Sequence, residues 1–189
     1  MSSPMIARDL QATLRKAYDD AQAMRHEYVT LEHLLLALLD DPKALRALES
    51  CGVHRGRLRK GLQKFFEGIP KLPDGVDAEP HQTLAVERVL QRAAIHAISS
   101  EMQVIDGANV LVQLFYERES HAVYLLDQEG AQQFDLKRYV SHGIRPDGTS
   151  EDDGFPAPSD DDEEGENRRV DPLVPDCPGR RMSAHARIT

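Results

Sequence analysis

Eight histidines are the residues of this sequence best suited to metal binding or proton transfer. No two of them have the i, i+4 spacing that places a pair of metal ligands on one face of a helix. A metal site would need a grouping in space, such as His26 with Glu27 and Glu32. We therefore expect no metal or other cofactor. Histidines within helices, such as His33 and His96, are expected to cap helices or to be partly buried and hydrogen-bonded.

The sequence motifs of several enzyme classes do not occur in the 189 residues. GxxxxGK[ST], which cradles nucleotide phosphates, is missing, as are GxGxxG, GxSxG and HExxH. A Ser/His/Asp triad forms only in three dimensions, so the sequence leaves it open. No serine lies in a predicted strained turn, however, and we expect that this chain is not an enzyme.

The net charge of −9 comes mostly from one segment. The run Ser159–Glu166 (SDDDEEGE) contains six acidic residues, and the rest of the chain is close to neutral. A nucleic-acid partner would need a net-basic face, so we expect none. No apolar stretch reaches the ~18 residues of a membrane span, and the N-terminus has no signal-peptide core. We expect a cytoplasmic protein without a membrane partner, in which Cys51 and Cys177 form no disulfide.

The elements that would position any site are helices. Leu10, Leu14, Ala17 and Ala21 recur at i, i+4, i+7 and i+11, which predicts an amphipathic helix over about 6–24. Further helices are expected from the N-cap Thr30 to about residue 39, at 42–51 with Gly52 as its C-cap, and at 54–67. Three prolines and two glycines in residues 68–80 predict a loop.

The second half of the sequence repeats the first at an offset of 76. The apolar stripe of the first helix recurs as Val86, Leu90, Ala93 and Ala97, and the pair Val29-Thr30 recurs as Ile105-Asp106. Helices are expected at about 83–99, 106–117, 119–129 and 134–141, with the register slipping by two so that Gly130 corresponds to Gly52. Internal repetition without strand signals predicts an all-α fold, an eight-helix pseudo-twofold double repeat of a four-helix unit.

These patterns divide the chain into two parts. Residues 1–143 are predicted to form the helical domain, with repeat one at about 6–67 and repeat two at about 83–143. Residues 144–189 are rich in acidic residues, proline and glycine, and contain too little apolar surface to offset the entropy of ordering. We predict that they form a disordered linker or tail.

Residues 26–39 (HEYVTLEHLLLALL) are similar to the signature that opens Clp repeats, and the sequence thereby resembles the N-terminal (Clp repeat) domain of ClpA-type unfoldases. Residues 83–93 (TLAVERVLQRA), 107–112, 119–126 and 141–143 resemble the second repeat of the ClpA branch. The resemblance implies a mobile docking domain on a ring-shaped AAA+ unfoldase. Such a domain receives unfolded or tagged protein substrates and docks a ClpS-like adaptor that delivers N-degron proteins.

The resemblance also implies which residues contact the adaptor, namely Glu27, Glu32, Thr83, Arg88 and Arg92. The residues themselves allow simpler explanations. Arg88 and Arg92 lie i, i+4 on one helix, where they could solvate its surface or pair with Glu87 and its neighbours. Glu32 lies at a predicted helix start, where the helix dipole favours a negative charge.

Three functional hypotheses remain open from the sequence, of which the third is a helical regulator unrelated to proteolysis. In the first, the chain is a docking module of Clp proteolysis, in contact with an adaptor, with substrates and with the Clp unfoldase. In the second, it is a truncated fragment of a complete ATP-dependent unfoldase. The stretch RVDPL at 169–173 resembles the sequence before the first ATPase module, but the residues after it resemble nothing in that module.

Overall fold

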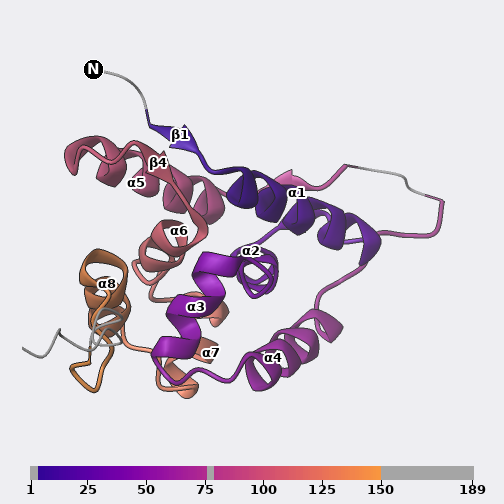
Figure 1. Cartoon of the computed structure of the whole chain (residues 1–189). Helices are drawn as coiled ribbons and strands as arrows, with labels where there is room; N and C mark the ends of the chain where they lie inside the picture. Colours follow the sequence, from indigo (N-terminus) through magenta and orange to yellow (C-terminus); the bar gives the residue numbers. More distant parts are fainter. Residues whose placement is uncertain (1–3, 76–78, 150–189) are drawn as a thin grey trace, which may run out of the picture. The chain divides into compact units, whose positions relative to one another are not determined.

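The structure, a computed structural model, describes residues 4–75 and 79–149. Within these ranges the chain forms eight α-helices and four two-residue strands (Figure 1). The helices are α1 (Arg8–Ala23), α2 (Leu31–Leu38), α3 (Pro42–Ser50), α4 (Arg55–Glu67), α5 (Leu84–Ser99), α6 (Gly107–Leu114), α7 (His121–Gln128) and α8 (Gln133–His142). The strands are β1 (Met5–Ile6), β2 (Tyr28–Val29), β3 (His81–Gln82) and β4 (Val104–Ile105). The all-α fold class is thereby confirmed.

The predicted repeat is present in the element boundaries. Helices α1 and α5 begin and end 76 residues apart, and so do α2 and α6. The N-cap of α2 is Thr30, which forms a capping box with His33, and α6 has the equivalent box between Asp106 and Asn109. Each box satisfies backbone N–H groups that a helix start leaves unpaired. The same local chemistry therefore starts the same helix in both halves.

The four short strands were not predicted from the sequence. Strand β1 pairs in parallel with β4, and β2 pairs in parallel with β3, so both ladders join one repeat to the other. The prediction that the first helix includes Ile6 is wrong for this reason. The backbone N–H of Met5 donates to Gln103 and that of Ala7 to Ile105, which holds residues 5–7 extended until α1 begins at Arg8. Two-residue segments are too short to show the alternation that identifies a strand.

Helices α2 and α6 form the centre of the domain. All eight residues of each helix are buried, which is typical of a helix that is surrounded by others. The predicted inward stripes pack against them: Leu10, Ala17 and Ala21 of α1 are buried, and so are Val86, Ala93 and Ala97 of α5. Leu14 and Leu90 are half-buried at the border of the core.

Two glycines end helices as expected from the sequence. Gly52 after α3 and Gly130 after α7 have φ angles of +78° and +83°, in the left-handed region that glycine adopts without strain. Gly107 has a different role, because the Cγ atom of Asp41 lies 2.3 Å from where its Cβ would be. The carboxylate of Asp41 caps α3 by accepting from the N–H groups of Lys43 and Ala44. The absence of a side chain at residue 107 therefore lets α6 approach α3 closely.

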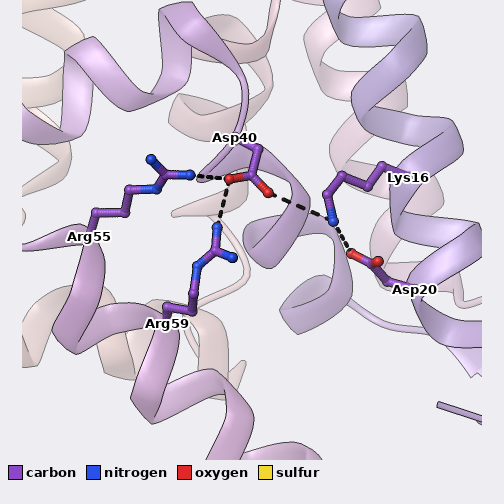
Figure 2. A network of polar contacts seen from close by, with 5 residues as sticks. All are labelled: Lys16, Asp20, Asp40, Arg55 and Arg59. Atoms are coloured by element: carbon purple, nitrogen blue, oxygen red, sulfur yellow. Dashed lines mark hydrogen bonds and ion pairs between the residues drawn. The ribbon is translucent and has the colours of Figure 1, made fainter. Parts of the chain in front are cut away.

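A charge network joins α1, the end of α2 and α4 (Figure 2). The carboxylate of Asp40 accepts from Arg55 and, at 2.6 Å, from Arg59, both on α4. Its second oxygen lies 3.7 Å from Lys16 Nζ of α1, which also bonds Asp20 at 2.5 Å. Partial burial opposes ionisation of Asp40, but the hydrogen bond from Arg55 and the charge of Arg59 together lower its pKa. Two of the arginines of α4 thus form ion pairs within repeat one.

The remaining predictions about organisation are tested only in part. The loop predicted for residues 68–80 contains no helix or strand at 68–75 and 79–80. Of the predicted tail, residues 150–189 lie outside the described residues, together with Cys177 and the acidic run. Cys51 is half-buried, and burial raises the pKa of its thiol. None of the described helices has both the length and the apolar character needed to cross a membrane.

Candidate functional site

The β2–β3 ladder joins the two segments that contain the predicted docking residues Glu27 and Thr83. The backbone carbonyl of Glu27 accepts from His81 N–H at 2.9 Å, and the carbonyl of Val29 accepts from the N–H and the hydroxyl of Thr83 at 3.2 and 3.1 Å. Glu27, just before β2, therefore pairs with His81 of β3, whereas Thr83, the N-cap of α5, pairs with Val29. The side chain of Glu27 is exposed, and its hydrogen bond to Tyr28 raises the pKa of that tyrosine.

Arg88 and Arg92 converge on one acidic residue of the α6–α7 connection. The Glu117 carboxylate accepts from Arg88 Nη2 at 2.6 Å and from Arg92 Nη2 at 2.5 Å. The hydrogen bond from Arg88, aided by that from Arg92, lowers the pKa of Glu117 to about 2, although burial acts against this shift. The partner of the arginines is therefore Glu117, which the sequence did not indicate, and Glu87 instead accepts from Gln91.

The two arginines differ in their availability to a partner. The Arg88 side chain is 53% exposed, whereas that of Arg92 is 30% exposed and lies 5.7 Å from the centre of the Tyr116 ring. Arg88 also lines a surface hollow of about 500 Å³ between the start of α5 and the α6–α7 connection. Leu31 and Ser120 contribute to the same hollow. Arg88 is thus the more accessible of the two arginines, and Glu117 holds its guanidinium in position.

Glu32 does not belong to this exposed group. It is only 6% exposed, and its Oε1 atom accepts from the backbone N–H of Ala122 in the first turn of α7 at 3.1 Å. The carboxylate thus caps a helix of the other repeat, a role that its position in α2 did not reveal. The structure therefore separates Glu32 from the surface that contains Glu27, Thr83 and Arg88.

Exposed apolar side chains complete this surface, and the sequence reasoning did not identify them. Leu84, directly after Thr83, is 71% exposed and lies one helical turn before Arg88. Tyr28, beside Glu27, is 48% exposed. An apolar centre with charged residues around it is the usual composition of a protein-binding surface. We call Glu27, Tyr28, Thr83, Leu84 and Arg88 the ladder surface.

A second apolar region involves the other ladder. Five aliphatic side chains of α5, β1 and β4 are between 39% and 71% exposed. They are Met5, Ile6, Ile95, Ile98 and Val104, which we call the aliphatic face. The positions related to them by the offset of 76 carry His81, Gln82, Asp19, Gln22 and Tyr28. Because the other repeat folds without aliphatic residues at these positions, the fold itself does not require them. A comparison of the residue types at positions 76 apart would have found this difference between the repeats in the sequence.

His26, considered as a metal ligand, and His33 form hydrogen bonds within the fold. In the described part of the chain, no group of three or more His, Cys, Asp or Glu side chains is arranged to hold a metal ion. His33 is fully buried and its Nδ1 accepts from the Thr30 N–H at 3.1 Å, as expected for a capping residue. His26, also buried, bonds His33 and does not gather with Glu27 and Glu32 around an ion.

The sequence matches the family described as "Clp repeat (R) N-terminal domain" over residues 5–129. The chain belongs to this family. This Clp repeat domain is 40% identical over 148 residues to a "ClpA homolog protein" of Fuscovulum blasticum, covering 76% of the chain and 18% of that relative. It is 29% identical over 101 residues to "Chaperone protein ClpB" of Chlamydia pneumoniae, covering 52% of the chain and 12% of that relative. The chain therefore spans less than a fifth of the length of these two curated relatives.

Solved structures of other Clp N-domains have the same fold. The Hsp104 N-terminal domain from Candida albicans superposes with a TM-score of 0.62 at 13% identity, covering 75% of this chain and 94% of that one. The N-domain of ClpV from Vibrio cholerae gives 0.58 at 18% identity, covering 75% and 92%. A complex of a ClpV N-domain with a VipB peptide gives 0.56 at 18% identity, covering 72% and 84%. One N-domain of this fold thus binds a peptide of another protein.

Proposed function

We propose that this Clp repeat domain is a docking module of Clp proteolysis that binds a ClpS-like adaptor and protein substrates and performs no catalysis itself. The observation that carries the proposal is the composition of the ladder surface. The β2–β3 pairing joins the segment of repeat one that contains Glu27 to the segment that leads into Thr83, with Leu84 exposed and Arg88 one turn along α5. The proposal is supported by three of the five residues implied by the family resemblance, which lie on the segments joined by this ladder next to the exposed side chains of Tyr28 and Leu84.

The chemistry of this surface suits an adaptor with both apolar and acidic contact residues. Leu84 can enter an apolar pocket of the partner, where most of the affinity of such contacts arises. Arg88 is held by Glu117 and already ordered, so it loses little conformational freedom when it meets a carboxylate. Exposed charges such as Glu27 mainly orient the approaching protein.

Titration of the purified domain with a ClpS-like adaptor tests this surface. We expect saturable binding that weakens at least tenfold in Arg88→Glu and in Leu84→Ser. Arg57→Glu is the matched control, because Arg57 is also exposed and also pairs with a glutamate of repeat two, Glu129. Failure of the wild-type domain to bind, or equal losses in Arg57→Glu, would count against the ladder surface.

The aliphatic face is the proposed site for substrates. Unfolded chains expose apolar segments that folded proteins bury, and exposed apolar side chains are suitable contacts for them. The asymmetry between the repeats supports a functional role, since repeat one has Asp19 and Gln22 where repeat two has Ile95 and Ile98. We expect binding of a reduced, carboxymethylated unfolded protein to fall in the double variant Ile95→Asp/Ile98→Gln, which introduces the residues of repeat one. Phe134→Gln, which removes an exposed apolar residue on α8, is expected to bind like the wild type.

A further inference from the structure

Three aromatic rings form a row where α4 of repeat one lies beside α7 of repeat two (Figure 1). Phe65 of α4 stacks on His121, with ring centroids 4.5 Å apart and an angle of 16° between the rings. His121 in turn contacts Tyr124, one turn along α7, at a centroid distance of 5.3 Å. The inner end of the row is anchored in the core, because Phe65 also contacts the buried ring of Phe66. Its outer end is accessible, since Tyr124 is 52% exposed.

The packing of the two helices holds these rings in place. A Cβ at Gly61 of α4 would lie 2.9 Å from a Cδ atom of Leu125, so the missing side chain lets α7 approach α4 closely. Gln128 donates from Nε2 to the Tyr124 hydroxyl at 2.6 Å, which fixes the outer ring. Aromatic side chains that are already ordered lose little conformational freedom when a partner binds them. The row is therefore preorganised for such a contact.

The corresponding pair of helices, α3 and α8, is built without these rings. At the offset of 78 that relates Gly52 to Gly130, every buried residue of α3 falls on a buried residue of α7. At this offset the three ring positions carry residues without aromatic rings, namely Gly143 for Phe65, Lys43 for His121 and Arg46 for Tyr124. Because one pair of helices packs without the row, folding does not account for its presence in the other.

The exposed side of α4 is cationic. The helix has five basic residues before its first acidic residue, Glu67. Three of the five form ion pairs, with Asp40 or Glu129. The other two, Lys60 and Lys64, are exposed and lie i, i+4 on one face of the helix. In the described part of the chain, neither lysine has an ion-pair partner, so both are available to an anionic group.

The alignment of the helices places the two lysines beside the outer ring. The contacts that Gly61 and Phe65 make with α7 are four residues apart on both helices and run in opposite directions. The helices are therefore antiparallel, and Tyr124 is level with the interval between Lys60 and Lys64. A molecule that lies on the ring of Tyr124 thus has two exposed cations next to it on α4.

We propose that an acidic peptide segment with one aromatic residue, part of another protein, binds the α4–α7 face. The face consists of two lysines and three rings: Lys60, Lys64, Phe65, His121 and Tyr124. The aromatic residue of the segment packs on the exposed ring, where most of the affinity arises, and its carboxylates meet the lysines, which orient it. The inference needs neither the ladder surface nor the aliphatic face and goes beyond the proposed docking function.

The charge of the whole chain makes this proposal a sharp one. With a net charge of −9, the chain as a whole repels an acidic peptide. Binding therefore requires a local group of cations, such as the exposed side of α4. Since charged contacts at a surface are screened by ions, added salt should weaken the complex.

Fluorescence titration of an acidic tryptophan peptide with the full chain tests the face. The chain contains no tryptophan, so the emission of N-acetyl-Glu-Glu-Trp-Glu-Glu-amide reports binding directly. We expect saturable binding that weakens with salt, and no binding of the same peptide with lysine in place of glutamate. The analogue with glycine in place of tryptophan is expected not to displace the probe.

Three results of this titration would overturn the proposal. They are the absence of a saturable change with the acidic peptide, equal binding of the lysine peptide, and displacement by an equal concentration of the glycine analogue. Stronger displacement by a single-stranded thymidine oligonucleotide would overturn the peptide as occupant and assign the face to a nucleic acid.

Reversal of charge on α4 locates the cations. Lys60→Glu/Lys64→Glu is expected to weaken binding of the acidic peptide at least tenfold. Arg8→Glu/Arg15→Glu is the matched control, because it reverses two exposed cations of α1 and changes the net charge equally. Circular dichroism checks that both variants keep their helices. Equal losses in the two variants would mean that net charge alone governs binding and would contradict the α4–α7 face.

Removal of the exposed ring tests the aromatic contact. Tyr124→Ser is expected to weaken peptide binding at least tenfold, whereas Phe134→Ser, which removes an exposed ring of α8, should leave it unchanged. Unchanged binding in Tyr124→Ser would contradict the proposal. All of these variants retain Leu84 and Arg88, so adaptor binding is expected to persist. Loss of the peptide with an intact adaptor site concerns the α4–α7 face alone, and joint loss of both would overturn a separate site.

Discussion

The carboxylate of Glu32 in α2 accepts a hydrogen bond from the backbone N–H of Ala122 in α7, 90 residues further along the chain. Both residues are buried, so this bond joins the two repeats inside the core. The equivalent of Glu32 in repeat two is Ala108, which cannot cap a helix, and α3 is capped by its own Asp41. The buried N–H groups at the starts of α3 and α7 are thus paired with different acceptors, Asp41 of the same repeat for α3 and Glu32 of the other repeat for α7.

Removal of this carboxylate is expected to destabilise the domain. Glu32→Ala leaves the Ala122 N–H buried without a partner, which costs about 1–3 kcal/mol. Glu32→Gln retains an acceptor oxygen and is expected to lose less. Urea unfolding followed by circular dichroism measures the difference, with the exposed Glu27→Ala as the control that changes stability by less than about 0.5 kcal/mol.

The same variants decide whether Glu32 also contacts an adaptor. We expect Glu32→Gln to bind a ClpS-like adaptor as tightly as the wild type, since the side chain is 6% exposed. Weaker adaptor binding with unchanged stability would restore the docking role that the family resemblance implies.

The Glu117 cluster predicts a loss of stability in acid. The pKa of Glu117 is lowered to about 2 from an ordinary value of 4.5, chiefly by the hydrogen bond from Arg88. A lowered carboxyl pKa contributes stability that is present above 4.5 and is lost as the pH falls towards 2. Urea unfolding at pH 5 and pH 3 should therefore show a smaller loss in Glu117→Gln than in the wild type. Equal losses in both proteins would mean that the two arginines do not stabilise the ionised carboxylate.

The buried histidine pair predicts a second pH dependence in a higher range. Burial lowers the pKa of His33 to about 4 from 6.5, so between these values the unfolded chain binds more protons than the folded one. Stability should then fall as the pH drops from 6.5 to 4, by up to about 1.4 kcal/mol per pH unit for each proton.

His33→Asn tests this dependence, because Asn109 forms the capping box of repeat two. The variant is expected to have a flatter stability profile between pH 6.5 and 4, measured by urea unfolding at several pH values. His142→Asn, at the exposed end of α8, is expected to follow the wild-type profile. An unchanged slope in His33→Asn would show that other groups cause the acid sensitivity.

Gly107 and Gly56 provide a matched pair of substitutions. Gly107→Ala places a Cβ 2.3 Å from Asp41 Cγ in the core, and such overpacking costs about 1–3 kcal/mol. Gly56→Ala in α4 meets no atom within 4 Å and should stabilise the domain by up to about 1 kcal/mol through helix propensity. Thermal or urea unfolding of both variants is expected to give changes of opposite sign. A neutral Gly107→Ala would mean that α3 and α6 can move apart freely.

The helical architecture followed from local patterns. The stripe from Leu10 to Ala21 and its copy from Val86 to Ala97 gave two helices whose ends match at an offset of 76. Thr30, Gly52 and Gly130 marked helix ends because capping depends on a few neighbouring residues. The short strands were not predicted because their hydrogen bonds join residues far apart in the sequence, as between Met5 and Gln103 and between Glu27 and His81.

The candidate site could be predicted only in part from the sequence. By itself the sequence determined which residues resemble a docking set and which of them share a helix, since these relations are local. Only the tertiary structure decided that Glu32 is buried as a cap, that Arg88 and Arg92 share Glu117, and that Phe65 stacks on His121. Each of these outcomes depends on how the two repeats and the loop between them pack. Packing fixes the burial and the partner of a polar group, whereas the order of residues fixes only its neighbours along the chain.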